Sequence, residues 1–300
     1  MDERFCTAGE LELCYETFGD PADPTLLLIM GLGTQMLGWH EDFCRLLADH
    51  GLHVVRYDNR DIGRSTHLDD LPVPTPRQLI LRRPPSPGYD LGHMAQDAAG
   101  LLDGLGVDAA HVVGASMGGM IAQTLAARRP ERVRSLTSIM STTGGRTVGQ
   151  PALRVLPMFL QRPSTDRDSV IERTVKLFAM VGSPGFERDE AALRELAGAS
   201  YDRDHDPRGS GRQLAAILRS GDRTAEVRRI SAPTLVIHGD KDRLVRPSGG
   251  KATARAIRGA RLELIAGMGH DLPRPAWPQL VELIAGHVRR TGAVAGAAAA

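Results

Sequence analysis

The chain has 300 residues, 42% of them hydrophobic, which is enough for one sizeable core with or without a small accessory layer. Lys and Arg number 37 and Asp and Glu number 36, so no broad electrostatic field favours nucleic acid or an anionic membrane surface. No uncharged apolar run reaches the length of a membrane span. We therefore expect neither a nucleic-acid partner nor stable membrane insertion.

The cysteine content and the N-terminal residues indicate the cellular compartment. Cys6, Cys14 and Cys44 are odd in number and confined to the first sixth of the chain, which is typical of a reducing compartment and not of a disulfide framework. Residues 1–4 lack the apolar core of a signal peptide. Together these features predict a cytoplasmic protein.

Strand and helix patterns alternate through the first half of the chain, which predicts a mostly parallel sheet covered by helices on both faces. The segment 11–18 alternates apolar and polar residues as a half-exposed edge strand would, whereas 25–30 is continuously apolar, as in a strand buried on both sides. The other expected elements are strands near 53–58, 111–114 and 133–140, and helices near 39–49, 92–105 and 117–129. A long proline-rich connection covers 59–89.

The alternation stops after residue 141. Residues 142–227 are rich in Arg, Asp and Pro, with helical patterns near 152–161, 168–181, 189–199 and 212–220. We predict a helical cap, or lid, over residues 142–227, inserted after the sixth strand of a core formed by 1–141 and 228–292. Further strands are expected near 234–238 and 261–265 and further helices near 250–257 and 279–288, followed by a low-complexity tail at 293–300.

The segment 111–119 contains a Gly-x-Ser-x-Gly pattern centred on Ser116, with an apolar strand before it and a helix after it. A serine on a tight strand-to-helix turn projects its hydroxyl above the sheet, where the N-terminus of the helix favours a developing negative charge. The pattern alone is weak, and an ordinary glycine-rich turn is the alternative. The flanking strand and helix favour Ser116 as a nucleophile.

A nucleophilic hydroxyl needs a base and an acid that orients the base. His270 lies in the glycine-rich loop 267–271 after the last strand, at the end of a parallel sheet where reacting groups gather, although a histidine without a catalytic role is the alternative. Two acids, Asp240 and Asp242, follow the strand near 234–238. We favour Asp242, which lies further round the turn, and expect Asp240 to cap it. The order Ser, Asp, His along the chain is typical of this arrangement.

The oxyanion formed during such a reaction needs backbone N–H donors. We predict the Leu32 and Met117 amides for this role, Leu32 lying in the loop 31–33 after the first buried strand. The same loop is not a dinucleotide fingerprint, because Met36 stands at the third glycine position.

No spacing predicts a metal or another cofactor. His40 and Cys44 share a helical face, and residues 204–206 (Asp-His-Asp) form a short acidic patch, but both are more typical of structural positions.

Five segments in this order resemble the α/β-hydrolase superfamily over nearly the whole chain, and more narrowly actinobacterial lipases and carboxylesterases, including methylesterases that act on aclacinomycin-type polyketides. They are LLLIMGLG (26–33), RYDNRDIGRS (56–65), HVVGASMGG (111–119), TLVIHGDKD (234–242) and GMGHDLP (267–273). The resemblance implies catalytic roles for Ser116, Asp242 and His270, oxyanion roles for Leu32 and Met117, and a mostly structural role for the second segment. The chain departs from the commonest pattern at Met30, where many relatives carry histidine.

We therefore predict a serine hydrolase that cleaves small or moderately hydrophobic carboxylic esters through an acyl-enzyme, with no cofactor. The same triad also suits a thioesterase, a C–C bond hydrolase, an acyltransferase or a slow hydrolase that serves as a ligand sensor. Apolar residues of the cap pack within it or line a pocket; they are Leu156, Met158, Phe159, Phe178 and Met180. The pattern does not indicate an oligomeric state.

Overall fold

The computed structural model describes residues 2–160 and 164–298, and its centre is one eight-stranded sheet in the order β1-β2-β4-β3-β5-β6-β7-β8. The strands are β1 (Arg4–Ala8), β2 (Leu11–Phe18), β3 (Thr25–Ile29), β4 (His53–Tyr57), β5 (Ala110–Ala115), β6 (Val133–Ile139), β7 (Thr234–Gly239) and β8 (Arg261–Ile265). β1 pairs antiparallel with β2 and β2 antiparallel with β4, and all other pairs are parallel. The prediction of a mostly parallel sheet is confirmed.

The edge of the sheet differs from the prediction. β2 was expected at the edge, but it lies between β1 and β4, and β1 is the edge strand. The burial of β2 reflects this, because Leu13–Tyr15 are buried in succession and the strand does not simply alternate. β1 is short and mostly exposed, so it carries little of the apolar signal by which strands are found in a sequence.

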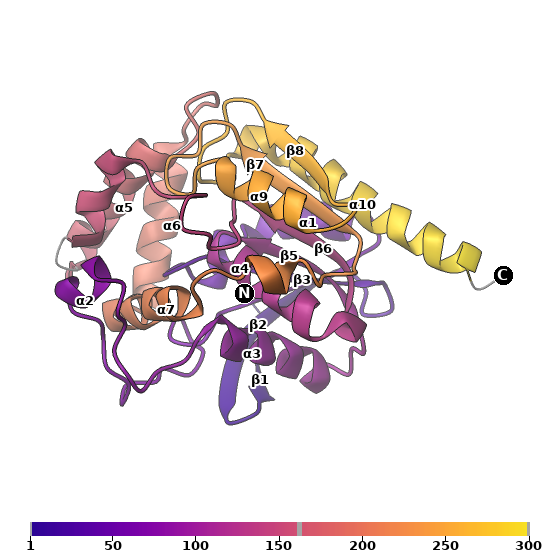
Figure 1. The fold of residues 1–300 in the computed structure, drawn as a ribbon, viewed down its shortest axis with the longest axis horizontal. Coiled ribbons are helices and arrows are strands. Elements are labelled where there is room, and N and C mark those ends of the chain that lie inside the picture. The colour runs from indigo at the N-terminus through magenta and orange to yellow at the C-terminus, as the bar shows by residue number, and fades with distance from the viewer. Residues whose placement is uncertain (1, 161–163, 299–300) are drawn as a thin grey trace.

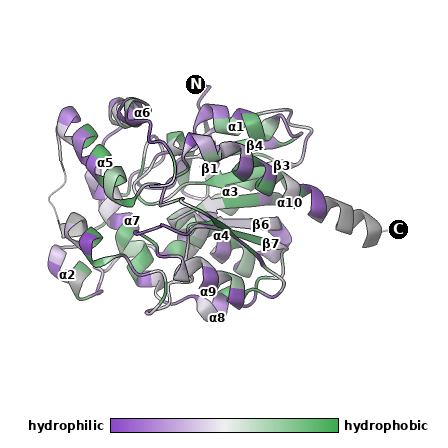
Figure 2. Ribbon diagram, turned by 90° about the horizontal axis from the view of Figure 1, so that it is seen from above, coloured by the Kyte–Doolittle hydropathy of each residue, from purple (hydrophilic) through white to green (hydrophobic). Residues whose placement is uncertain are grey.

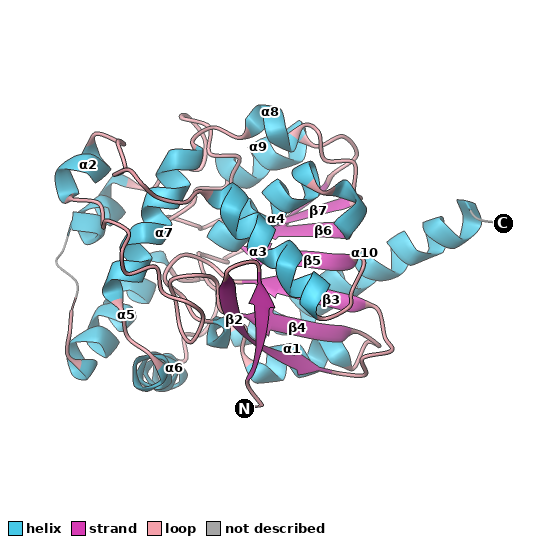
Figure 3. Cartoon of the chain, turned by 90° about the horizontal axis from the view of Figure 1, so that it is seen from below, coloured by secondary structure: helices cyan, strands magenta, loops and turns pink. Residues whose placement is uncertain are grey.

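Helices cover both faces of the sheet, as predicted (Figure 3). On one face, α3 (Leu91–Gly104) and α4 (Met117–Arg128) share a hydrophobic cluster with the strands, and α9 (Ser248–Ala256) packs beside β7. On the other face, α1 (Glu41–Ala48) and α10 (Trp277–Ala298) form a second cluster. Among the strands between these layers, β3 and β7 are strongly hydrophobic (Figure 2), and every residue of β3 is buried.

The last helix is longer than the sequence pattern indicated. α10 runs from Trp277 to Ala298 and takes in most of the predicted tail, because alanine has the highest helix propensity and the tail contains no breaker after Gly296. Across residues 2–160 and 164–298, no helix combines the length and the apolar character that crossing a membrane requires.

Between β6 and β7 the described residues form helices and no strand. We call residues 142–227 the inserted segment. Its helices are η3 (Leu153–Leu160), α5 (Arg167–Val181), α6 (Glu190–Arg203), α7 (Pro207–Ser220) and α8 (Thr224–Val227). η3 is a 3₁₀-helix with Pro157 inside it. Helices α5, α6 and α7 gather with α2 (Pro76–Ile80) at one end of the molecule, and α10 projects from the other (Figure 1).

The two ends of the inserted segment meet at a buried arginine. The Arg223 backbone N–H donates to the Thr143 carbonyl at 2.8 Å, and its guanidinium donates to the Thr142 carbonyl at 2.7 Å and the Met120 carbonyl at 3.0 Å. Burial lowers the pKa of Arg223 to about 10. Since Met120 belongs to α4, this arginine joins the base of the inserted segment to the helix that follows Ser116.

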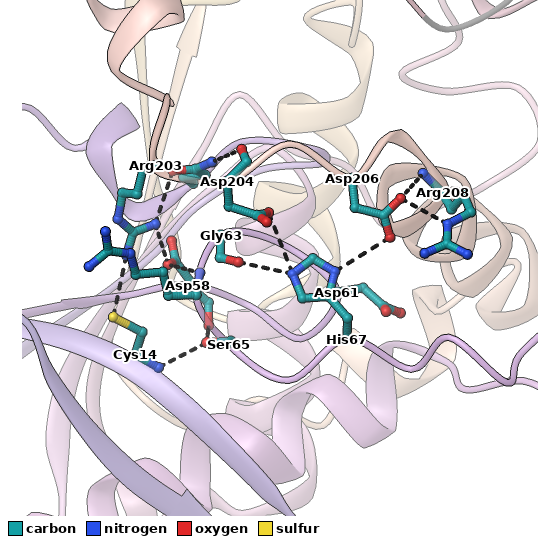
Figure 4. A network of polar contacts seen from close by, with 12 residues as sticks. Cys14, Asp58, Asp61, Gly63, Ser65, His67, Arg203, Asp204, Asp206 and Arg208 are labelled. Atoms are coloured by element: carbon teal, nitrogen blue, oxygen red, sulfur yellow. Dashed lines mark hydrogen bonds and ion pairs between the residues drawn. The ribbon is translucent and has the colours of Figure 1, made fainter. Parts of the chain in front are cut away.

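A polar network joins the inserted segment to the loop after β4 (Figure 4). Arg203, at the end of α6, pairs with Asp58 at 2.6 Å, and both side chains are buried. His67 lies between the carboxylates of Asp204 and Asp206, 3.5 Å from each. The segment that the resemblance marked as structural thus anchors α6 and α7.

Candidate active site

Ser116 lies at the turn between β5 and α4, at φ 56° and ψ −118°. A non-glycine residue rarely adopts a positive φ, and at functional sites such strain is maintained by the surrounding contacts. Here the Ser116 N–H donates to the Ile139 carbonyl at 2.9 Å, and the Ser141 hydroxyl donates to the Ser116 carbonyl at 2.8 Å. Ser116 is partly exposed, while its neighbours on both sides are buried.

The two glycines of the pattern allow this turn to pack closely. A Cβ at Gly114 would overlap the Gly118 carbonyl, and a Cβ at Gly118 would overlap the carbonyl oxygen of Ile29 on β3. Both residues therefore lack a side chain for a steric reason, and α4 approaches β3 closely enough to place its N-terminus beside the loop that follows β3.

The structure brings His270 between Ser116 and Asp242. His270 Nε2 lies 2.9 Å from Ser116 Oγ, and His270 Nδ1 lies 2.7 Å from Asp242 Oδ2. These three residues come from the ends of β5, β8 and β7, which lie at the same edge of the sheet. The series of hydroxyl, imidazole and carboxylate can transfer the hydroxyl proton to the imidazole while the carboxylate orients the ring.

Asp242 is buried and fully hydrogen-bonded. Its Oδ1 accepts from the Leu244 and Val245 N–H groups at 2.9 Å each. Burial alone would raise the pKa of Asp242, but the imidazoles of His270 and His238 beside it lower that pKa to about 2. The carboxylate is therefore ionised at neutral pH, as an orienting group must be.

Asp240, the other acid of this loop, has a different partner. Its Oδ1 accepts from the Gly267 N–H at 2.7 Å. Asp240 therefore holds the beginning of the loop that carries His270, and only Asp242 contacts the imidazole.

The two predicted oxyanion donors lie in segments next to Ser116. Gly31 packs against the Ser116 side chain, and Leu32 follows it, while Met117 is the first residue of α4. Within residues 2–160 and 164–298, neither the Leu32 nor the Met117 amide donates a hydrogen bond, as is usual for the first turn of a helix. Both amides are thus free for a ligand.

Sequence reasoning missed Gln213 of α7. This buried amide accepts from the Gly33 N–H at 2.9 Å and donates to the Arg60 carbonyl at 2.8 Å. It ties the loop that carries Leu32 to the inserted segment. Its sequence signal is weak, because the neighbouring Arg212 is also polar and buried on this helix.

Met30, the departure from the commonest family pattern, is buried in the cluster around Trp39, and its carbonyl accepts from the Asn59 side chain at 3.0 Å. Because this residue packs in the core, it contributes its backbone and not a polar side chain to the loop beside Ser116.

Within the described part of the chain, no group of three His, Cys, Asp or Glu side chains could hold a metal ion. His40 instead caps α1 by accepting from the Asp42 N–H at 3.1 Å. Cys44 hydrogen-bonds the Trp39 carbonyl. Asp204 and Asp206 pair with His67.

Comparisons with known proteins show which family the chain belongs to. Residues 24–273 match the family model of the alpha/beta hydrolase fold. The chain is 32% identical to rhodomycin D methylesterase DnrP of Streptomyces peucetius and 33% identical to rhodomycin D methylesterase DauP of Streptomyces sp. (strain C5), in each case over 96% of this chain and 99% of the relative. Among solved structures, the enol-lactonase of Burkholderia xenovorans LB400 aligns with a TM-score of 0.76 at 21% identity, covering 95% of this chain and all of that one.

These relatives support ester hydrolysis. On the family match and on two relatives above 30% identity over nearly its full length, the chain belongs to the α/β-hydrolase family.

Proposed function

We propose that the protein is a serine carboxylesterase that works through an acyl-enzyme, with Ser116 as nucleophile, His270 as base and Asp242 as orienting acid. The observation that carries this proposal is the unbroken series of contacts from Ser116 Oγ through both nitrogens of His270 to Asp242 Oδ2.

In the first step the Ser116 hydroxyl attacks the ester carbonyl and its proton passes to His270 Nε2. The oxygen that becomes negative is held by the Leu32 and Met117 amides, at the positive end of the α4 dipole. As the intermediate collapses, the bond to the alkoxy group breaks and His270 returns the proton to the leaving alcohol.

In the second step water attacks the acyl-enzyme. His270 takes a proton from the water, a second oxyanion forms in the same site, and collapse releases the carboxylic acid while Ser116 recovers its proton. No step needs a metal or an organic cofactor.

We propose a small-molecule methyl ester as the substrate class, carried on a polyketide-type molecule of moderate hydrophobicity. The support is the pair of relatives named rhodomycin D methylesterases, which align with nearly the whole chain.

We also propose that residues 142–227 act as a cap on a core formed by 1–141 and 228–292. Phe178 and Met180, at the end of α5, are half-buried, whereas the side chains of Leu156, Met158 and Phe159 lie outside the described residues. Three free cysteines support a cytoplasmic location.

The decisive test is reaction with a fluorophosphonate probe, followed by peptide mapping of the adduct. We expect one adduct on Ser116, and we expect Ser116→Ala to abolish labelling and to lower ester turnover by several orders of magnitude. Ser169→Ala is the matched control, since Ser169 is an exposed serine of α5, and it should label and turn over as the wild type does. Near-full esterase activity in the Ser116→Ala variant would reject the assignment.

Substrate class is tested separately by rates on matched oxoester and thioester substrates and on a series of methyl esters of increasing size. Faster cleavage of the thioester would replace esterase with thioesterase. Slow single turnover with a retained product would instead indicate a ligand sensor.

A further inference from the structure

The loop that carries His270 lies against the inserted segment, not only against the sheet. At the end of α5, the Val181 carbonyl accepts from the His270 N–H at 2.7 Å, and just after this helix the Gly185 N–H donates to the Gly267 carbonyl at 2.9 Å. Residues 181–185 and 267–271 are thus joined backbone to backbone, although they lie far apart in the sequence.

One side chain from the inserted segment adds two bonds on either side of His270. The Ser183 hydroxyl accepts from the Gly269 N–H at 2.8 Å and donates to Asp271 Oδ1. A hydroxyl can do both at once, because it has one proton and two lone pairs. Gly269 and Asp271 are the two neighbours of His270, so one oxygen atom brackets the proposed base.

Asp271 gains from this contact. Burial raises the pKa of Asp271 above its ordinary value, and the hydrogen bonds from Ser183 act in the opposite direction. A carboxylate with little access to water needs such donors. If the Ser183 hydroxyl were removed, the Asp271 side chain would need another hydrogen-bond donor, and the loop that carries it would shift.

Among the described residues, the core's hydrogen bonds to the backbone of the same loop lie near its ends, and Asp242 of the core bonds the His270 side chain. Asp240 accepts from Gly267, the Lys241 N–H donates to the Met268 carbonyl at 2.9 Å, and the Trp277 indole donates to the Leu272 carbonyl at 2.8 Å. The centre of the loop, residues 269–271, receives its backbone contacts from Val181 and Ser183.

We propose that Ser183 is a positioning residue for acyl transfer, which acts by holding His270 at hydrogen-bond distance from both Ser116 and Asp242. This inference rests on the proposed function, in which His270 is the base. The imidazole must meet two partners at 2.9 and 2.7 Å, and a displacement of about 1 Å in such a site costs on the order of 10²-fold in rate.

The test compares Ser183→Ala with Ser220→Ala in the full chain. Ser220 is a matched control, because its hydroxyl also joins the inserted segment to the core: it accepts from the Leu91 N–H at 2.9 Å and donates to the Ala216 carbonyl at 2.9 Å. It contacts no loop of the triad. For each variant we would measure kcat and KM on p-nitrophenyl acetate, the rate of fluorophosphonate labelling, and Tm.

We expect Ser183→Ala to lower kcat and the labelling rate about 10- to 100-fold with KM within about twofold, because substrate binding does not involve the hydroxyl. Ser220→Ala should lower Tm by a similar amount and leave kcat within about twofold. A third variant, Asp271→Asn, keeps an acceptor for Ser183 and removes the charge. We expect it to retain kcat within about threefold, which separates positioning from a charge effect.

Equal losses of kcat in the two serine variants, or unchanged kcat in Ser183→Ala, would overturn the positioning role while leaving the proposed function intact. The same holds if Asp271→Asn loses as much activity as Ser183→Ala, since the charge would then be what matters. A wild-type protein that neither cleaves esters nor reacts with the probe would overturn both proposals.

Discussion

The turn that carries Ser116 and the loop that carries His270 are built in opposite ways. Ser116 is held by its own strand and helix and by β6, through the Ile139 carbonyl and the Ser141 hydroxyl. The His270 side chain is held by Asp242 of the core, whereas the backbone of its loop is held by Val181 and Ser183 of the inserted segment. The contacts of the proposed nucleophile therefore come from the core, whereas the position of the proposed base also depends on how the inserted segment packs. A change in the inserted segment should reach catalysis through the base before it reaches the nucleophile.

The largest effect should come from breaking the core's hold on the base. Asp242→Asn should lower kcat on the order of 10⁴-fold, because a neutral amide neither selects the required imidazole tautomer nor stabilises the imidazolium. The measurement is steady-state turnover at neutral pH, and Asp240→Asn is the control from the same loop. Asp240→Asn keeps an oxygen for the Gly267 N–H and should stay within about threefold of the wild type. The reverse ranking of the two variants would move the orienting role to Asp240.

A second variant changes the close packing of α4 against β3 behind Ser116, the proposed nucleophile. Gly118→Ala places a Cβ against the Ile29 carbonyl, so α4 must shift away from β3, and kcat should fall about 10²-fold or more together with a lower Tm. Gly286→Ala in α10 is the matched control. Only the far ends of flexible side chains lie near a Cβ there, and the change should be neutral or add up to about 1 kcal/mol of stability. If both variants behave alike, the close packing behind Ser116 has no catalytic consequence.

A smaller effect should follow from releasing the loop that carries Leu32. Gln213→Leu removes the acceptor of the Gly33 N–H and the donor to the Arg60 carbonyl. We expect kcat to fall about 10-fold with KM within about twofold, since the oxyanion donor is displaced but not removed. A rise in KM at unchanged kcat would instead assign Gln213 to substrate binding.

The contrast between a turn held by residues close in sequence and a loop held by distant residues also explains what could be predicted from the sequence. The interior strands and most helices were placed within a few residues, because their apolar periodicity is local. Ser116 is recognisable for the same reason, since its turn is specified by adjacent glycines, a strand and a helix. Asp242 and His270 were located by a weaker argument, that polar loops at the ends of parallel strands converge.

Ser183 and Gln213 left no local pattern. Their partners lie 86 and 180 residues away in the sequence, so their contacts exist only once the helices of the inserted segment pack onto the sheet. β1 was missed for a related reason: an exposed edge strand is specified by its neighbour, β2, and not by its own hydrophobicity.

His67 offers the mildest test of how the inserted segment is attached (Figure 4). Burial alone would lower the pKa of His67, but its bond to the Gly63 carbonyl and the nearby carboxylates of Asp204, Asp206 and Asp61 raise that pKa above 6.5. The charged imidazole thus lies between acids of the inserted segment and of the core. This group is raised in the folded state, so its contribution to stability is complete below pH 6.5 and is lost as the pH rises through the folded pKa.

His67→Gln should therefore lower Tm most near about pH 5.5 and least above about pH 8. The corresponding loss in free energy of unfolding should differ between the two pH values by less than about 1 kcal/mol, because solvent screens partly exposed ion pairs. The control is His205→Gln, a second histidine of this region whose imidazole bonds the Ser164 carbonyl at 3.0 Å. The interpretation requires the pH dependence of the Tm loss to be larger in His67→Gln than in this control. Activity should change less than in Asp242→Asn, Gly118→Ala or Gln213→Leu, because this contact holds α6 and α7 and touches neither the Ser116 turn nor the His270 loop. A loss of kcat at high pH in wild type that disappears in His67→Gln would show the opposite, that the attachment of these helices also controls the base.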